Sequence, residues 1–212
     1  MENIMRKKIF YAALKIMVPV LAVSVLWGCA ALKHKKEPLV VGQPQHPAGI
    51  EANRIQPGLS VLYFYDLYRY MYQMPKGDAI IRKGTPGPPI LQLNHRFGDG
   101  KVFDSGVNKG VGMVMTGYLH LEQPGPYAFQ AKSNDGFELY INDNLLISDP
   151  AVHGDKVSEP GLMTAAEGGW FPVMIKYFQR KGTATLELYW KPPGAESFAI
   201  IPPEVYGHQP EQ

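Results

Sequence analysis

Alternation of apolar and polar side chains dominates the second half of this 212-residue chain. Successive side chains of a β-strand point to opposite faces of a sheet, so a period of two indicates strands that bury one face. The apolar positions fall on one side of five stretches: Met113, Met115, Leu119 and Leu121; Tyr127, Phe129 and Ala131; Phe137, Leu139 and Ile141; Phe171, Val173, Ile175 and Tyr177; Ala184, Leu186, Leu188 and Trp190. We expect these five sets to line one core.

Turn-forming residues separate these stretches, at positions 123–126, 134–136, 142–144 and 181–182. Asn, Asp, Gly and Pro in such clusters favour tight turns between strands. Only residues 67–72 suggest a helical turn. Many short alternating strands without a long helix predict an all-β fold, an antiparallel β-sandwich or barrel.

The first 28 residues have the pattern of a cleaved signal peptide. Three basic residues, Arg6, Lys7 and Lys8, precede an apolar run at 16–26, which has 11 residues and is short for a membrane span. The run ends in Leu-Trp-Gly-Cys-Ala at 26–30, which resembles the lipobox of bacterial lipoproteins. The resemblance implies lipidation of Cys29. An uncleaved anchor from about residue 9 to 32 is the alternative.

Cys29 is the single cysteine, so the chain cannot form an internal disulfide. A lipid on Cys29 would anchor the protein to a membrane of the bacterial cell envelope. Ala30 in place of an Asp resembles the arrangement associated with outer-membrane sorting. The net charge is +2, and the leader holds four basic residues and one acid, so the remaining chain carries 2 − 3 = −1. This balance argues against a nucleic-acid partner.

The composition divides the chain into four parts. Residues 1–28 are the predicted signal peptide, and residues 29–57 are the lipidated cysteine followed by a flexible tether rich in Pro, Gly and Lys. Residues 58–207 hold the alternating strands and form the predicted β domain. Residues 208–212 are a short tail.

Four fragments carry a resemblance to a known family. They are Thr-Gly-Tyr-Leu at 116–119, Pro-Gly-Pro-Tyr-Ala-Phe at 124–129, Ser-Asn-Asp-Gly-Phe-Glu-Leu-Tyr-Ile-Asn-Asp at 133–143, and Gly-Gly-Trp-Phe-Pro-Val at 168–173 with Tyr177, Leu186, Leu188, Trp190, Ile201 and Pro202 after it. In order and spacing they resemble the PA14 domain, named after the anthrax protective antigen. The resemblance implies a β-sandwich-like barrel that acts as a binding module, often for carbohydrate.

The resemblance also points to a site at Asn134, Asp135 and Gly136. In fungal adhesins of the family, two adjacent Asp residues at this position hold a calcium ion that contacts a sugar. Asn134 retains an oxygen at the first position but removes one negative charge, which weakens an oxygen site for calcium. Asp149, Asp155 or the segment 142–144 could add oxygens. The alternative is that 134–136 is a tight turn in which Gly136 supplies a positive φ.

No motif of a nucleophile elbow, zinc pair or phosphate loop is present, so the sequence names no catalytic residue and predicts no enzyme. Aromatic side chains are dense at 63–72 and could stack on sugars or pack in the core. Two hypotheses remain. The first is a membrane-anchored module that binds glycans, with calcium as its candidate cofactor. The second is a structural or assembly lipoprotein that docks an envelope protein. A glycan-acting enzyme has the least support.

Overall fold

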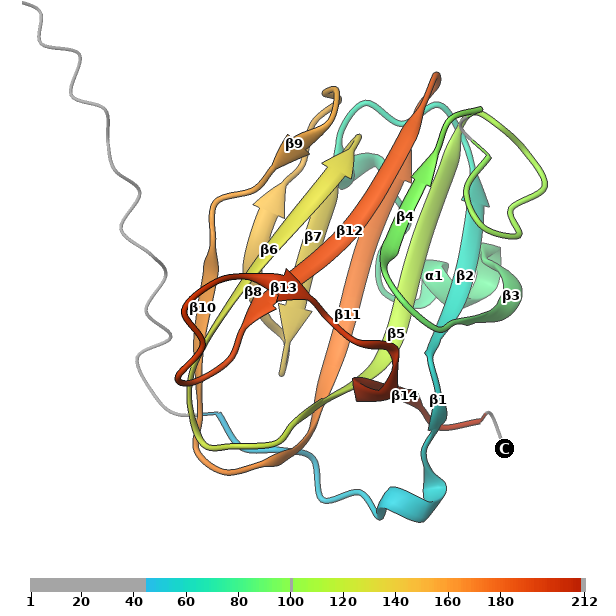
Figure 1. The fold of residues 1–212 in the computed structure, drawn as a ribbon. Helices are drawn as coiled ribbons and strands as arrows, with labels where there is room; N and C mark the ends of the chain where they lie inside the picture. Colours follow the sequence, from blue (N-terminus) through green and yellow to red (C-terminus); the bar gives the residue numbers. More distant parts are fainter. Residues whose placement is uncertain (1–44, 100, 211–212) are drawn as a thin grey trace, which may run out of the picture. The chain divides into compact units, whose positions relative to one another are not determined.

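The computed structural model describes residues 45–99 and 101–210. β-Strands dominate this part of the chain, with one short α-helix and three single 3-10 turns (Figure 1). The elements are η1 Ala52–Arg54, β1 Gln56–Pro57, β2 Leu59–Tyr65, η2 Met71–Gln73, α1 Asp78–Lys83, β3 Thr85–Ile90, β4 Asn94–Phe97, β5 Val111–Leu121, β6 Gly125–Asn134, β7 Phe137–Ile141, β8 Asn144–Asp149, β9 Lys156–Val157, β10 Gly161–Ala165, β11 Gly169–Gln179, β12 Ala184–Lys191, β13 Ala199–Ile200, η3 Pro203–Val205 and β14 Tyr206–His208.

The strands form two antiparallel sheets that pack as a sandwich. The first sheet has the order β1-β14-β5-β11-β7-β8, and β2 pairs with β5 while β3 pairs with β2. The second has the order β10-β6-β12-β13, with β4 on β12 and β9 on β6. The longest ladder joins β5 and β11 along their whole lengths. The prediction of an all-β antiparallel sandwich is confirmed.

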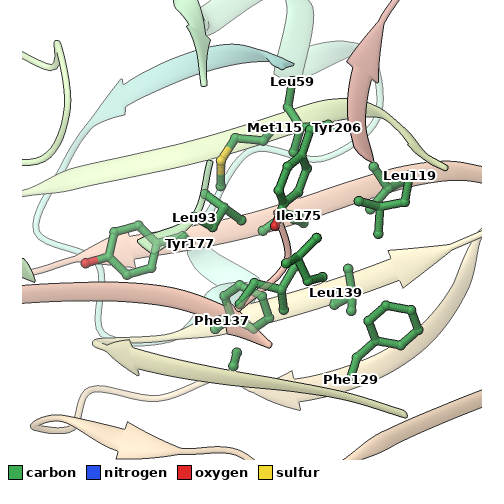
Figure 2. Close-up of a cluster of buried hydrophobic side chains, with 14 of the residues drawn as sticks. Leu59, Leu93, Met115, Leu119, Phe129, Phe137, Leu139, Ile175, Tyr177 and Tyr206 are labelled. Atoms are coloured by element: carbon green, nitrogen blue, oxygen red, sulfur yellow. The ribbon is translucent and has the colours of Figure 1, made fainter. Parts of the chain in front are cut away.

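The core lies between the sheets and follows the alternation. All members of the five predicted sets are buried except Trp190, which is partly buried and packs against the same cluster. Figure 2 shows Met115 and Ile175 from the first sheet and Phe129 from the second within this cluster. Fully burying a side chain of this size stabilises the fold by roughly 1.5–3 kcal/mol. The core therefore supplies the main stabilisation of a domain without internal disulfides.

A second apolar cluster covers the outer face of the first sheet. Its buried members are Phe64, Tyr68, Met71, Met74, Val114 and Phe178. Phe64, Val114 and Phe178 alternate with core residues on their strands, so they point to the opposite face. The segment between β2 and β3 covers them. The helical turn expected at 67–72 begins only at Met71, and α1 was not anticipated.

The domain boundaries differ from the predicted ones. The Gln45 backbone donates to Thr164 O at 2.7 Å and accepts from Ala166 N at 2.7 Å, and β1 pairs with β14. Residues 45–57, expected within the tether, therefore belong to the β domain. At the other terminus, His208 lies in β14 instead of the tail, and its Nδ1 is 3.0 Å from Gly58 O. Backbone pairing places both segments in the β domain, and composition does not reveal this pairing.

The predicted signal peptide, the lipidation at Cys29 and the first part of the tether lie outside the described residues, so they stay predictions. Within the described ranges, the chain contains no helix with the length and apolar character needed to cross a membrane.

Candidate functional site

Five connections meet at one end of the sandwich. They are residues 66–70, 98–110, 135–136, 150–155 and 180–183, and we call them the loop end. Backbone hydrogen bonds tie neighbouring connections together. Asp66 N donates to Gly110 O at 3.0 Å, Gly110 N donates to Arg180 O at 2.9 Å, and Val152 N donates to Arg69 O at 3.2 Å. Loops on a rigid β scaffold are a common place for binding residues.

The predicted site residues lie at the centre of the loop end. Asn134 ends β6 in the second sheet and Phe137 begins β7 in the first, so residues 135–136 cross between the sheets. The stretch 134–136 therefore connects the two sheets and is not a hairpin turn within one sheet. The Asn134–Asp135 peptide bond is cis. Asp135 N donates to Phe178 O at 3.2 Å, and Phe178 N donates to Gly136 O at 3.0 Å.

Gly136 has a different role from the predicted one. Its φ is not among the positive values, which include those of Asn142 and Asp143 in the β7–β8 turn. A Cβ on Gly136 would instead lie 2.9 Å from Cζ and 3.0 Å from Cδ1 of Phe178. The Phe178 side chain is fully buried. Lack of space against this ring, and not backbone conformation, explains the glycine.

Asp135 is almost completely buried, with 3% of its surface exposed. Its Oδ1 accepts the His153 N–H at 3.1 Å and its Oδ2 accepts the Arg180 N–H at 2.7 Å. Burial raises the pKa of this carboxyl, and the two backbone donors offset part of the rise. The carboxylate thereby joins three connections of the loop end.

Asn134 contacts a polar network on the second sheet. Its Nδ2 lies 3.2 Å from Asp155 Oδ1 and 3.4 Å from Thr183 Oγ1, while its carbonyl accepts the Tyr177 hydroxyl at 2.5 Å. Lys132 Nζ is 3.5 Å from Asp155 Oδ2. Burial opposes ionisation of Asp155, but the hydrogen bonds from Asn134 and Thr185 and the Lys132 charge together lower its pKa.

This arrangement does not fit a calcium ion, which takes six to eight oxygen ligands. Asp135 is only 3% exposed, position 134 carries a neutral amide in place of a carboxylate, and the Lys132 ammonium already compensates Asp155. Within residues 45–99 and 101–210, no three His, Cys, Asp or Glu side chains are grouped as metal ligands would be. An ammonium at this position would also repel a divalent cation.

The other proposed oxygen donors point elsewhere. Asp149 Oδ2 lies 2.9 Å from Lys156 Nζ and 3.3 Å from His153 Nε2, so it has two basic neighbours. The segment 142–144 forms the β7–β8 turn at the end of the sandwich opposite the loop end, and its prediction as a turn between strands is confirmed. There Asn142 Nδ2 donates to His46 O at 2.8 Å. Of the candidates, only Asp155 joins the site.

A cavity of about 370 Å³ adjoins Asn134 through Thr183. It lies between the β4–β5 connection and the β11–β12 connection, and its lining is Gly98, Asp99, Asn108, Lys109, Lys181, Gly182 and Thr183. Sequence reasoning missed these residues because their connections are distant in sequence and carry no motif. A second cavity, of about 410 Å³, is lined by residues 126–128, 162–164 and 191–195 near the opposite end.

The structure divides the dense aromatic segment into core and rim. Tyr63, Phe64 and Tyr68 are buried, whereas Tyr70 and Tyr72 are 45% and 66% exposed. The two exposed rings stack with centroids 5.4 Å apart and an angle of 11°. Tyr70 also forms a β-bridge with Ala151 of the 150–155 connection. The stacked pair therefore lies at the rim of the loop end.

Comparison with solved structures gives the same fold at low sequence identity. An anti-sigma factor domain-containing protein from Clostridium clariflavum matches 74% of this chain with a TM-score of 0.60 and 16% identity. This chain spans 49% of that protein, about half its length. Epithelial adhesin 9 A domain from Candida glabrata, solved with Galβ1-4GlcNAc, matches 78% of this chain and 95% of its own, with a TM-score of 0.62 and 12% identity.

A third structure, described as the PA14 sugar-binding domain from an RTX adhesin, matches 72% of this chain and 98% of its own, with a TM-score of 0.51 and 20% identity. No curated protein matches the chain. The family model of the PA14 domain matches residues 93–203, which is more than half of the 212 residues. This stretch includes β4 to β13 and the central residues of the loop end, so the chain belongs to the PA14 domain family.

Proposed function

We propose that this protein is a non-catalytic carbohydrate-binding module whose ligand binds at the loop end. The observation that carries the proposal is the cavity beside Asn134. Thr183 lines that cavity and also contacts Asn134 Nδ2, so the cavity and the predicted site form one region. Its volume of about 370 Å³ falls within the usual range for small-ligand sites.

Two of the similar structures support this choice of ligand. The Candida glabrata adhesin domain was solved with a galactosyl disaccharide, and the RTX adhesin domain is described as sugar-binding. Because identity to both is 20% or less, they share the fold with this chain, and their ligands are only a guide. The local chemistry of the loop end must decide the saccharide.

The stacked Tyr70–Tyr72 pair adds an apolar surface to the same end. Sugar rings bury their aliphatic face on aromatic side chains, and exposed aromatics at a rim favour such contacts. The same segment is anchored by Tyr68 and Met71, which are buried in the second apolar cluster. We propose that the rim tyrosines contact a distal sugar unit while the cavity holds the terminal one.

We propose that binding needs no calcium. The adhesin-type calcium site requires oxygens at positions 134 and 135 that are free to ligate. Here position 134 carries a neutral amide whose Nδ2 faces Asp155, and the Lys132 ammonium lies 3.5 Å from Asp155 Oδ2. Titration of calcium into the protein should give no saturable heat, and a chelator should leave saccharide binding unchanged.

We also propose that the protein presents this module at the bacterial cell envelope, lipid-anchored through Cys29 at the outer membrane. Support comes from the leader and from where the domain begins. Gln45 enters the domain beside Ala165, at the end of the sandwich opposite the loop end (Figure 1). The chain therefore enters the β domain on the side away from the proposed binding site. Radiolabelled palmitate incorporation, lost in Cys29→Ala, tests the anchor.

A saccharide array probed with the full-length chain in mild detergent tests the binding proposal. Hits are then titrated into the Tyr72→Ala variant, because the wild-type ring is 66% exposed. We expect about tenfold weaker binding, since base- or sugar-stacking aromatics are worth about 1–3 kcal/mol. Ile81→Ala, an exposed residue of α1, is the matched control and should bind normally. No hit on the array would overturn the proposal.

One observation favours a second function, docking of an envelope protein. Leu67, Tyr70, Tyr72 and Val152 are all exposed on the loop end, and exposed apolar groups of this kind also occur at protein interfaces. Cross-linking in intact cells distinguishes the two. A single protein neighbour whose cross-link is lost in Tyr72→Ala, with no saccharide on the array, would favour docking.

A further inference from the structure

We propose that the ligand at the loop end is an acidic saccharide, a sugar bearing a carboxylate, held by Lys109 and Lys181. This inference rests on the proposed function and names the substrate class of the same site. Lys109 lies in the β4–β5 connection and Lys181 in the β11–β12 connection, and both line the cavity of about 370 Å³. Gly110 N donates to Arg180 O at 2.9 Å, so the two lysines lie on neighbouring connections of the loop end.

Neither lysine has an acidic partner among the described residues. The five ion pairs there involve Lys132, Lys156, Arg96 and two histidines. Both lysines are solvent-exposed. Two unpaired ammonium groups in one concave region attract an anion, and a carboxylate can accept hydrogen bonds from both. The cavity is therefore suited to a negative group.

The one acidic residue in the cavity lining, Asp99, accepts a hydrogen bond from the backbone of its own loop. Asp99 Oδ1 accepts the Lys101 N–H at 3.0 Å, which directs that oxygen to the backbone. The remaining polar lining groups are Asn108 and Thr183, both neutral and able to bond sugar hydroxyls. Two cations against one acid give the lining a net positive charge of +1.

The buried acid of the site does not cancel this charge. Asp135 is 3% exposed and its two oxygens accept the N–H groups of His153 and Arg180, so it faces the protein interior. Asp155 is paired with Lys132 on the second sheet. A calcium ion would attract sugar hydroxyls. Without a set of ligands for that ion, the lysines provide the positive charge, and a carboxylate is the group they select.

The test uses paired saccharides that differ only in charge. Galacturonate, glucuronate and N-acetylneuraminate oligosaccharides are compared with their neutral methyl esters, by titration calorimetry on the full-length chain in mild detergent. We expect each acidic form that binds to do so at least about tenfold more tightly than its ester. A charge-assisted hydrogen bond is worth about 1.5–3 kcal/mol, which is about tenfold or more in affinity. Higher salt should reduce the difference.

Variants locate the effect. Lys109→Gln with Lys181→Gln should remove the preference for the acidic form and leave the ester affinity unchanged. Lys76→Gln with Lys83→Gln makes the same change in net charge on exposed lysines outside the cavity and should bind as the wild type does.

Three outcomes are possible. Acid selectivity that is lost only in the cavity variant supports the inference. Equal binding of acids and esters, or acid selectivity that persists in the cavity variant, overturns it and leaves the proposed function standing. No binding of any saccharide in either form overturns the proposed function and this inference with it.

Discussion

Replacing Gly136 by alanine tests whether the Phe178 ring is the reason that position 136 requires glycine. A Cβ at this position would lie 2.9 Å from Phe178 Cζ, well inside van der Waals contact. Phe178 packs in the second apolar cluster, 6.1 Å from the Tyr68 ring centroid, so it has little room to move. Overpacking of this kind costs about 1–3 kcal/mol. For a domain of this size, each kcal/mol lowers Tm by about 2–4 °C.

A double-mutant cycle separates space from backbone conformation. Phe178→Leu alone should cost about 1–2 kcal/mol through lost packing. In the Phe178→Leu background, Gly136→Ala should lower the free energy of unfolding much less than it does in the wild type. The difference between the two backgrounds is the coupling energy, which we expect to be about 1 kcal/mol or more. Gly182→Ala is the control, because Gly182 has a φ of +86° and no atom near its Cβ position. Gly182→Ala should lower the free energy of unfolding by the same amount whether position 178 carries Phe or Leu.

Urea unfolding followed by tryptophan fluorescence gives the four free energies of unfolding. If Phe178→Leu leaves the cost of Gly136→Ala unchanged, the steric explanation is refuted.

Two further predictions concern the polar contacts of Asn134. Tyr177→Phe removes the hydroxyl that donates to the Asn134 carbonyl and should lower the free energy of unfolding by about 1 kcal/mol in urea, whereas an unchanged value would mean that this bond contributes nothing. Asp155 has a pKa lowered below its ordinary value of 3.8, so its contribution to stability is present above that value and is lost as pH falls through the folded pKa. Asp155→Asn should therefore reduce stability at neutral pH and flatten its decline below about pH 4, and parallel pH profiles of the two proteins would contradict this.

The sequence predicted the core well because alternation is a local signal. Phe137, Leu139 and Ile141, for example, are all buried as their spacing required. It also placed the β7–β8 turn, since Asn142 and Asp143 both adopt the positive φ that this pair tolerates. In such cases the residue type and the conformation it favours lie within a few positions of each other.

The site was harder to predict because its geometry depends on distant partners. Asn134, Asp135 and Gly136 have turn-forming composition, yet they cross between sheets because β6 pairs with β12 while β7 pairs with β11. The residues near Gly136 in sequence do not predict its contact with Phe178, which lies 42 positions away. The same holds for Lys109 and Lys181, which only the pairing of β5 with β11 brings to one cavity.

The most direct test of the proposed site is to locate a bound saccharide on the protein. A saccharide selected on the array, carrying a photoreactive group, is cross-linked to the full-length chain, and the adducts are located by peptide mass spectrometry. We predict adducts in the connections 98–110 and 180–183, which line the loop-end cavity. Adducts at residues 126–128, 162–164 or 191–195, around the cavity near the opposite end, would contradict the proposed site.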